Sequence, residues 1–149
     1  MLKNLIKYKF RILLILVLIL ALVCIRAFEN ELFYDPFLNY FKSNYQNINY
    51  PVINNFKLFL NLFFRFFLNT TFSLSIIYVI FKDIEIVKFA SVLFTFFFIV
   101  LIISFFICLF YFAETNKITL FYIRRFLIQP ILLLLFLPGF YFQSNVAKT

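Results

Sequence analysis

Four long apolar segments alternate with shorter polar ones along the chain, and each apolar segment predicts one membrane-spanning helix. We place these spans at residues 10–28, 56–81, 89–112 and 118–142. The last three are long enough to cross the roughly 30 Å hydrocarbon core of a bilayer with some tilt. The predicted fold class is therefore all-α: a polytopic membrane protein with four transmembrane helices in a single domain, residues 1–149.

The first span is shorter than the others. Its uninterrupted apolar run, residues 12–25, rises only about 21 Å as a helix, and a basic start followed by such a run also describes a secretory signal peptide. We interpret the segment as a retained span, because no small-x-small cleavage site follows it. Arg11 and Arg26 extend its usable length by snorkelling.

Composition agrees with a membrane location. Hydrophobic residues make up 65% of the chain and charged residues 13%, which lies far outside the usage of soluble domains. A net charge of +8 would indicate nucleic-acid binding in a soluble protein, but here the basic residues stand mostly at the margins of the apolar segments. We therefore expect membrane lipids, and no nucleic acid, among the partners.

The distribution of basic residues predicts the orientation. Seven lie on the side of the two termini and four on the opposite side, which puts both termini in the cytoplasm by the positive-inside rule. The first group is Lys3, Lys7, Lys9, Arg11, Lys82, Lys88 and Lys148, and the second is Arg26, Lys42, Lys57 and Lys117.

The segment between the first two spans predicts a short helix in the membrane interface. Asp35 is a candidate N-cap and Pro36 suits the first helical position. Phe37, Leu38 and Phe41 then share one side, which we expect to face the hydrocarbon.

Apart from Arg11 and Arg26 near the ends of the first span, three arginines lie inside the predicted spans, all in the outer half of the membrane: Arg65 in the second span, and Arg124 and Arg125 in the fourth. Polar residues accompany them at helical spacing, and polar stripes in lipid turn inward. We therefore predict a bundle whose outer half encloses a basic, hydrogen-bonding cavity, with Arg125 as the inward member of its pair. The candidate binding residues are Arg65, Arg124, Arg125, Gln129, Asn61 and Asn69.

Two interpretations of these arginines remain open. They pair with acidic residues of the same chain and fix the packing of the helices, or they bind an external anionic group. The acidic residues on the correct side are Glu29, Glu31, Asp35 and Glu114. A third possibility applies to Arg124, which could snorkel to lipid headgroups.

The sequence gives little support for catalysis. It contains no histidine, and Cys24 and Cys108 each stand alone within an apolar span. We expect no catalytic residue, no metal site and no cofactor. Pro130 and Pro138 predict a kink in the fourth span, because each removes a helical hydrogen bond.

Four segments carry a resemblance to a known family: "IRAFENELFYDPFLNYFK" (residues 25–42), "FRFFLNT" (64–70), "KDIEIVKF" (82–89) and "FYIRRFLIQP" (121–130). Together they resemble the exosortase F system-associated membrane proteins of flavobacteria, in the same order over nearly the whole chain. The resemblance implies a multi-pass protein of the bacterial inner membrane that works beside exosortase F, a transpeptidase-like enzyme of protein sorting. It does not imply that this chain is the enzyme, since exosortases use a Cys-His-Arg set that the chain lacks.

We therefore expect a noncatalytic accessory subunit of an exosortase F-type sorting system, with the outer-half arginines engaging an anionic group of a partner. The alternatives are an enzyme acting on a lipid-linked or anionic substrate, and a purely structural membrane protein.

Overall fold

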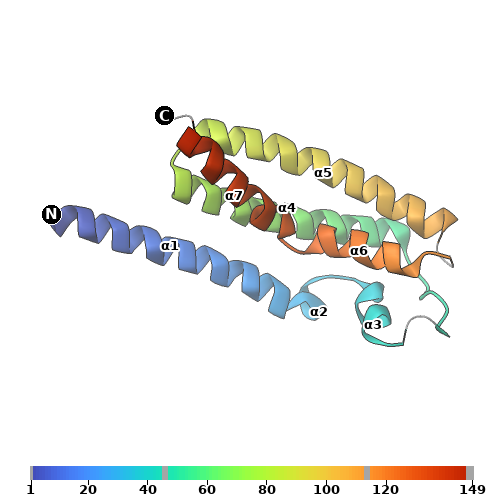
Figure 1. Cartoon of the computed structure of the whole chain (residues 1–149). Coiled ribbons are helices and arrows are strands. Elements are labelled where there is room, and N and C mark those ends of the chain that lie inside the picture. The colour runs from blue at the N-terminus through green and yellow to red at the C-terminus, as the bar shows by residue number, and fades with distance from the viewer. Residues whose placement is uncertain (1, 45–46, 113–114, 147–149) are drawn as a thin grey trace.

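The computed structural model describes residues 2–44, 47–112 and 115–146, and within these ranges it contains helices and no strands. The predicted all-α class is confirmed. The helices are α1 (Leu2–Ala27), α2 (Glu29–Leu32), α3 (Pro36–Lys42), α4 (Asn55–Phe81), α5 (Ile84–Tyr111), α6 (Lys117–Ile128) and α7 (Ile131–Val146) (Figure 1).

Helices α4 and α5 form a long antiparallel hairpin. Lys82 ends α4 in the left-handed region, with φ of 54°, and the carboxylate of Asp83 accepts a hydrogen bond from the backbone N–H of Glu85 at the start of α5. Because Asp83 caps the helix, α5 begins at Ile84 rather than at residue 89, where the apolar pattern alone placed it.

Among the described residues, three helices are long and apolar enough to cross a membrane: Tyr8–Ala27 of α1, Asn55–Phe81 and Ile84–Tyr111. A fourth span is present if α6 and α7 count as one, but the two meet at an angle of 62°. Residues 118–142 are therefore not one straight helix. The break falls at Gln129 and Pro130, so the kink predicted at Pro130 is present. At Pro138, the other proline, α7 continues without a break.

The helices bury an aromatic core and expose apolar side chains around it. Phe66 of α4 packs against Phe98 of α5 with ring centroids 4.8 Å apart, and Phe94 packs on Phe136 of α7 at 5.5 Å. On the outer surface Phe67 and Ile103 remain about half exposed. A buried core surrounded by exposed apolar side chains is compatible with a multi-pass membrane protein.

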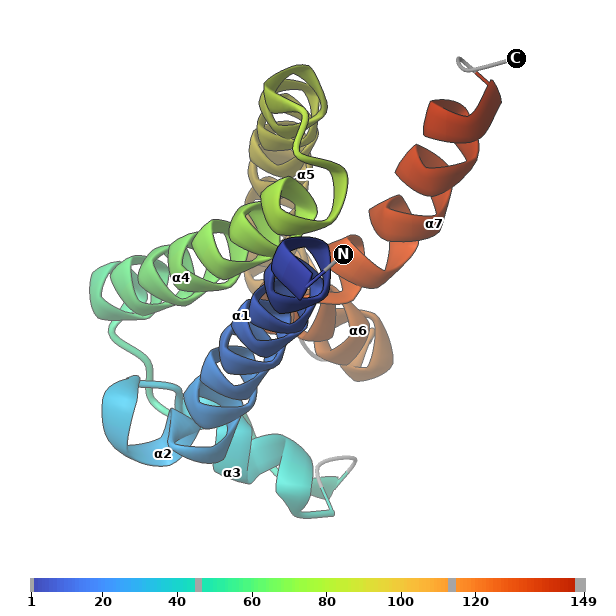
Figure 2. The ribbon, with the colours of Figure 1, turned by 90° about the vertical axis from the view of Figure 1, so that its left-hand side faces the viewer.

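Helix α1 lies along α4, and α7 diverges from the other helices toward the C-terminus (Figures 1 and 2). Arg11 of α1 donates hydrogen bonds to the carbonyls of Val79 and Ile80 in the last turn of α4. These carbonyls have no partner within the helix, so the guanidinium both caps α4 and holds α1 against it.

Candidate functional site

Three polar residues of α4, spaced by four, each bind a different segment of the chain. The side-chain oxygen of Asn61 accepts from the backbone N–H of Tyr34 at 3.0 Å. The guanidinium of Arg65 donates to Glu29 of α2, and the amide of Asn69 donates to the carbonyl of Ile128 at 2.9 Å. Residues spaced by four share one helix face, so this stripe joins the α1–α3 segment and the end of α6 to α4.

The centre of the site is an ion cluster of three arginines and two carboxylates. Arg65 Nη2 pairs with Glu29 Oε2, and Arg65 Nη1 lies 3.5 Å from Asp35 Oδ2. Arg124 Nε donates to both carboxylate oxygens of Asp35, at 3.3 and 3.1 Å, and its Nη2 also pairs with Asp35. Arg26 donates to Glu29 at 2.8 Å. We call these residues, Arg26, Glu29, Asp35, Arg65 and Arg124, the ion cluster.

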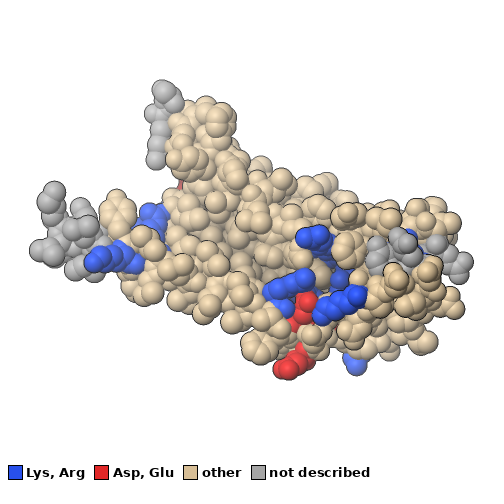
Figure 3. Space-filling model, turned by 60° about the horizontal axis from the view of Figure 1, so that its bottom comes forward, with Lys and Arg blue, Asp and Glu red and all other residues tan. Residues whose placement is uncertain are grey.

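Most of the ion cluster is buried. Arg65 is 1% exposed, Arg124 4% and Glu29 6%, whereas the side chain of Arg26 is 49% exposed. Three positive charges face two negative ones, so the cluster carries one positive charge in excess. Figure 3 shows basic side chains gathered around acidic atoms on one face of the molecule, within a largely uncharged surface.

Helices α2 and α3 place the two carboxylates. Glu29 is the first residue of α2, which follows α1 directly. Asp35 precedes Pro36 at the start of α3, as expected, but its side chain makes no capping hydrogen bond and instead binds Arg124. Two aromatic rings cover the guanidinium groups: Phe33 lies 5.2 Å from Arg65 and Phe41 lies 5.9 Å from Arg124, both measured from ring centroid to Cζ.

The apolar side of α3 packs on the protein. Phe37 is fully buried, its ring centroid is 6.1 Å from that of Phe105 in α5, and Leu38 is 7% exposed. We expected this side to face hydrocarbon. The aromatic side chains of α5 compete with lipid for the same surface, and the structure buries Phe37 between helices. The predicted short helix exists, and its position in the membrane interface stays a prediction.

The prediction that Arg125 is the inward member of the arginine pair is wrong. Arg124 is buried, and Arg125 is exposed and donates through Nε to Gln129 at 3.1 Å. The buried stripe of α6 consists of Leu120, Arg124, Leu127 and Ile128. Because the chain bends by 62° before Pro130, α6 and α7 are separate helices. The contacts of α6 alone therefore decide which arginine faces the protein interior.

The remaining acidic candidates lie apart from the ion cluster or outside the described residues. Glu31 is exposed, and Glu114 lies outside the described residues. Arg26 belongs to the site but was not among the predicted site residues, although its spacing of three from Glu29 was a usable signal. Cys24 is exposed and Cys108 is buried.

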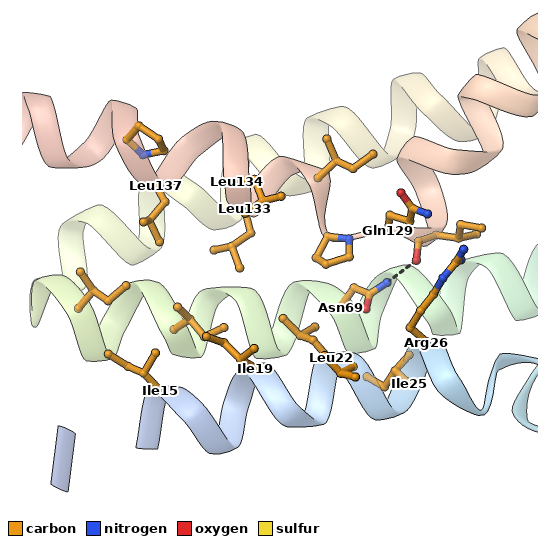
Figure 4. A pocket seen from close by; sticks show the side chains of 17 residues that line it. Ile15, Ile19, Leu22, Ile25, Arg26, Asn69, Gln129, Leu133, Leu134 and Leu137 are labelled. Carbon is orange, nitrogen blue, oxygen red and sulfur yellow. Dashed lines mark hydrogen bonds between the residues drawn. The ribbon is translucent and has the colours of Figure 1, made fainter. Parts of the chain in front are cut away.

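A lateral groove opens beside the ion cluster, between α1 and α7 with α4 as its floor (Figure 4). Its volume is about 670 Å³. Ile15, Ile19 and Leu22 of α1 face Leu133, Leu134 and Leu137 of α7 across it. Its polar lining residues, Arg26, Asn69 and Gln129, gather at one end.

In the part of the chain that the structure describes, the protein is all-helical. Three of its helices, or four spans if the bent pair counts as one, are long and apolar enough to cross a membrane, and the ion cluster lies largely buried among the helices. Comparison of the chain with protein-family models, curated proteins and solved structures finds no match. Within the described residues, no group of three or more His, Cys, Asp or Glu side chains could hold a metal ion.

Proposed function

We propose that this protein is a noncatalytic accessory subunit of an exosortase F-type protein-sorting system in the bacterial inner membrane. The resemblance of its four sequence segments to the proteins associated with that system supports the proposal. In this role the protein binds a multi-pass sorting enzyme through its helices and through an arginine that faces outward.

The observation that carries the proposal is that Arg124 is buried on a carboxylate of the chain while Arg125 is exposed. Arg65 and Arg124 are buried and bind carboxylates of their own chain, so an anionic partner does not reach them from the surface. Arg125 is exposed and, among the described residues, its side chain binds Gln129. It lies eight residues into α6, about 12 Å along the helix.

A guanidinium exposed at that depth costs free energy unless an anionic group reaches it. A carboxylate of a partner helix would remove the cost, because the planar guanidinium donates two parallel hydrogen bonds to such a group. Arg125 is therefore the residue through which we expect the partner to bind.

Co-purification tests this proposal. The protein is co-expressed with an exosortase F-type enzyme and isolated in mild detergent through a tag. We expect the enzyme to accompany the unaltered protein and to be lost from Arg125→Leu. Lys88→Leu, which removes an exposed charge at the start of α5, is the matched control and should retain the enzyme. Equal recovery with both variants, or no recovery with the unaltered protein, would contradict the proposal.

A purely structural membrane protein is the second candidate, and the ion cluster itself favours it. The cluster joins α1, α2, α4 and α6, together with Asp35 before α3, using only side chains of this chain. In that case Arg125→Leu would leave sorting unchanged, while variants in the ion cluster would lose the protein from the membrane.

A further inference from the structure

The lateral groove combines an apolar channel with a positive charge at one end. Its apolar lining side chains come from α1, α4 and α7, among them Ile19, Ile76 and Leu134. Arg26 closes the polar end and is the half-exposed member of a cluster that holds one positive charge in excess. We propose that the groove binds one anionic phospholipid, with an acyl chain along the channel and the headgroup at Arg26.

The dimensions fit an acyl chain. Arg26 is eleven positions after Ile15 on α1, which corresponds to about 16 Å along the helix. One leaflet of a bilayer contributes about half of the roughly 30 Å hydrocarbon core, or about 15 Å. An acyl chain of ordinary length therefore reaches from the polar end to the far end of the groove.

The placement of charge favours a lipid over a transmembrane helix of another protein. A phospholipid carries its negative charge in the headgroup, at the glycerol end of its acyl chains, which matches a groove that is apolar along its length and cationic at one end. A transmembrane helix in the groove would also fill the apolar length, but it would need a carboxylate at the level of Arg26 to pair with the excess positive charge, whereas an anionic phospholipid always carries its phosphate at that end.

Two side chains at the polar end of the groove have hydrogen-bond donors for the lipid headgroup. The half-exposed Arg26 uses Nη1 to bind Glu29, which leaves other donor atoms of its guanidinium for a phosphate oxygen. Gln129 accepts from Arg125 through its oxygen and so keeps its NH₂ group for donation. The ion cluster has a net charge of +1. Adding the nearby Glu31 and Arg125 contributes one negative and one positive charge, so the net charge around the polar end stays +1.

Native mass spectrometry tests the proposal on the full chain in detergent. The probes are phosphatidylglycerol, which is anionic, and phosphatidylethanolamine, which is zwitterionic. We expect one phosphatidylglycerol per protein, retained about tenfold better than phosphatidylethanolamine. Both lipids offer a phosphate to Arg26, but the ammonium group of phosphatidylethanolamine cancels the lipid's negative charge and is repelled by the excess positive charge of the ion cluster. Equal retention of the two lipids would overturn the proposal, as would a dimer or a bound peptide in place of lipid.

Two pairs of variants separate the groove from nonspecific lipid binding. Ile19→Trp fills the groove and should abolish retention, whereas Leu20→Trp, on the neighbouring exposed position of α1 outside the groove, should not. Arg26→Gln should remove the preference for phosphatidylglycerol, whereas Arg26→Lys and Lys42→Gln should keep it. The proposal fails if Ile19→Trp retains lipid or if Arg26→Gln keeps the preference. Lipid binding does not depend on the sorting role, so either proposal stands if the other fails.

Discussion

Arg124 of α6 donates through Nε to Oδ2 of Asp35 at 3.1 Å, and this contact joins two residues that are 89 positions apart in the sequence. Asp35 also lies against Arg65 of α4. One carboxylate thereby fixes the position of α6 and the start of α3 relative to α4. Arg124 makes this contact, whereas its neighbour Arg125 is exposed and binds Gln129.

Arg124→Leu should therefore destabilise the protein, and Arg125→Leu should not. Loss of Arg124 leaves the buried Asp35 with only the 3.5 Å contact to Arg65, which we expect to cost about 3 kcal/mol of unfolding free energy. Arg125 is exposed and pairs with no buried carboxylate in the described residues, so its replacement by leucine should not lower the unfolding free energy. Thermal unfolding in detergent, followed by circular dichroism, measures both. Equal effects would show that the two side chains are not distinguished by burial.

Glu29→Gln should lower the unfolding free energy strongly, although the two side chains are nearly the same size. It leaves three arginines and one carboxylate in the ion cluster, with Arg65 buried and short of its main partner, at a cost of about 3–5 kcal/mol. The second change Arg65→Leu should restore part of the loss, because Arg124 and Asp35 then remain as a balanced pair. A double-mutant cycle in the same unfolding assay measures the coupling. A double variant no more stable than Glu29→Gln alone would contradict the pairing.

Asn69→Ala should loosen the junction between α6 and α7. The amide of Asn69 binds the carbonyl of Ile128, which lies in the last turn of α6 and has lost its helical partner. We expect a loss of about 1 kcal/mol in unfolding free energy. Thr71→Ala is the control, since the Thr71 hydroxyl binds only the carbonyl of Phe67 in its own helix. The two variants should differ clearly in midpoint temperature, and identical midpoints would refute the role of Asn69.

Cysteine labelling tests the predicted orientation. In a Cys24→Ala, Cys108→Ala background, single cysteines at residues 44 and 47–49 should react with an impermeant thiol reagent from outside whole cells. Cysteines at residues 83–86 should react only after the membrane is opened. Labelling from the opposite sides would reverse the orientation that the basic residues predict.

The helices themselves were largely predictable, because each depends on local properties of the sequence. A run of apolar side chains predicts α4 at residues 56–81, and the structure gives Asn55–Phe81. Pro36 starts α3 as predicted, since its fixed φ suits the first helical turn. The start of α5 was misplaced because Asp83 caps it, an effect of one hydrogen bond that hydropathy does not register.

The candidate site was only partly predictable. Polar residues at a spacing of four indicated the face of α4 that carries Asn61, Arg65 and Asn69, and each of them does bind another segment. The same reasoning failed for α6, where it selected Arg125 instead of Arg124. It used only the spacing of polar residues within the span, and spacing does not register the carboxylate of Asp35, which binds Arg124.

The sequence by itself determined that this chain is helical and apolar and that charged residues stand within its apolar segments, because composition and periodicity set those properties residue by residue. Only the tertiary structure decided which guanidinium meets which carboxylate, and that a groove with a cationic end lies between α1 and α7. Those outcomes depend on the rotation and bending of helices against one another, which many distant contacts fix together.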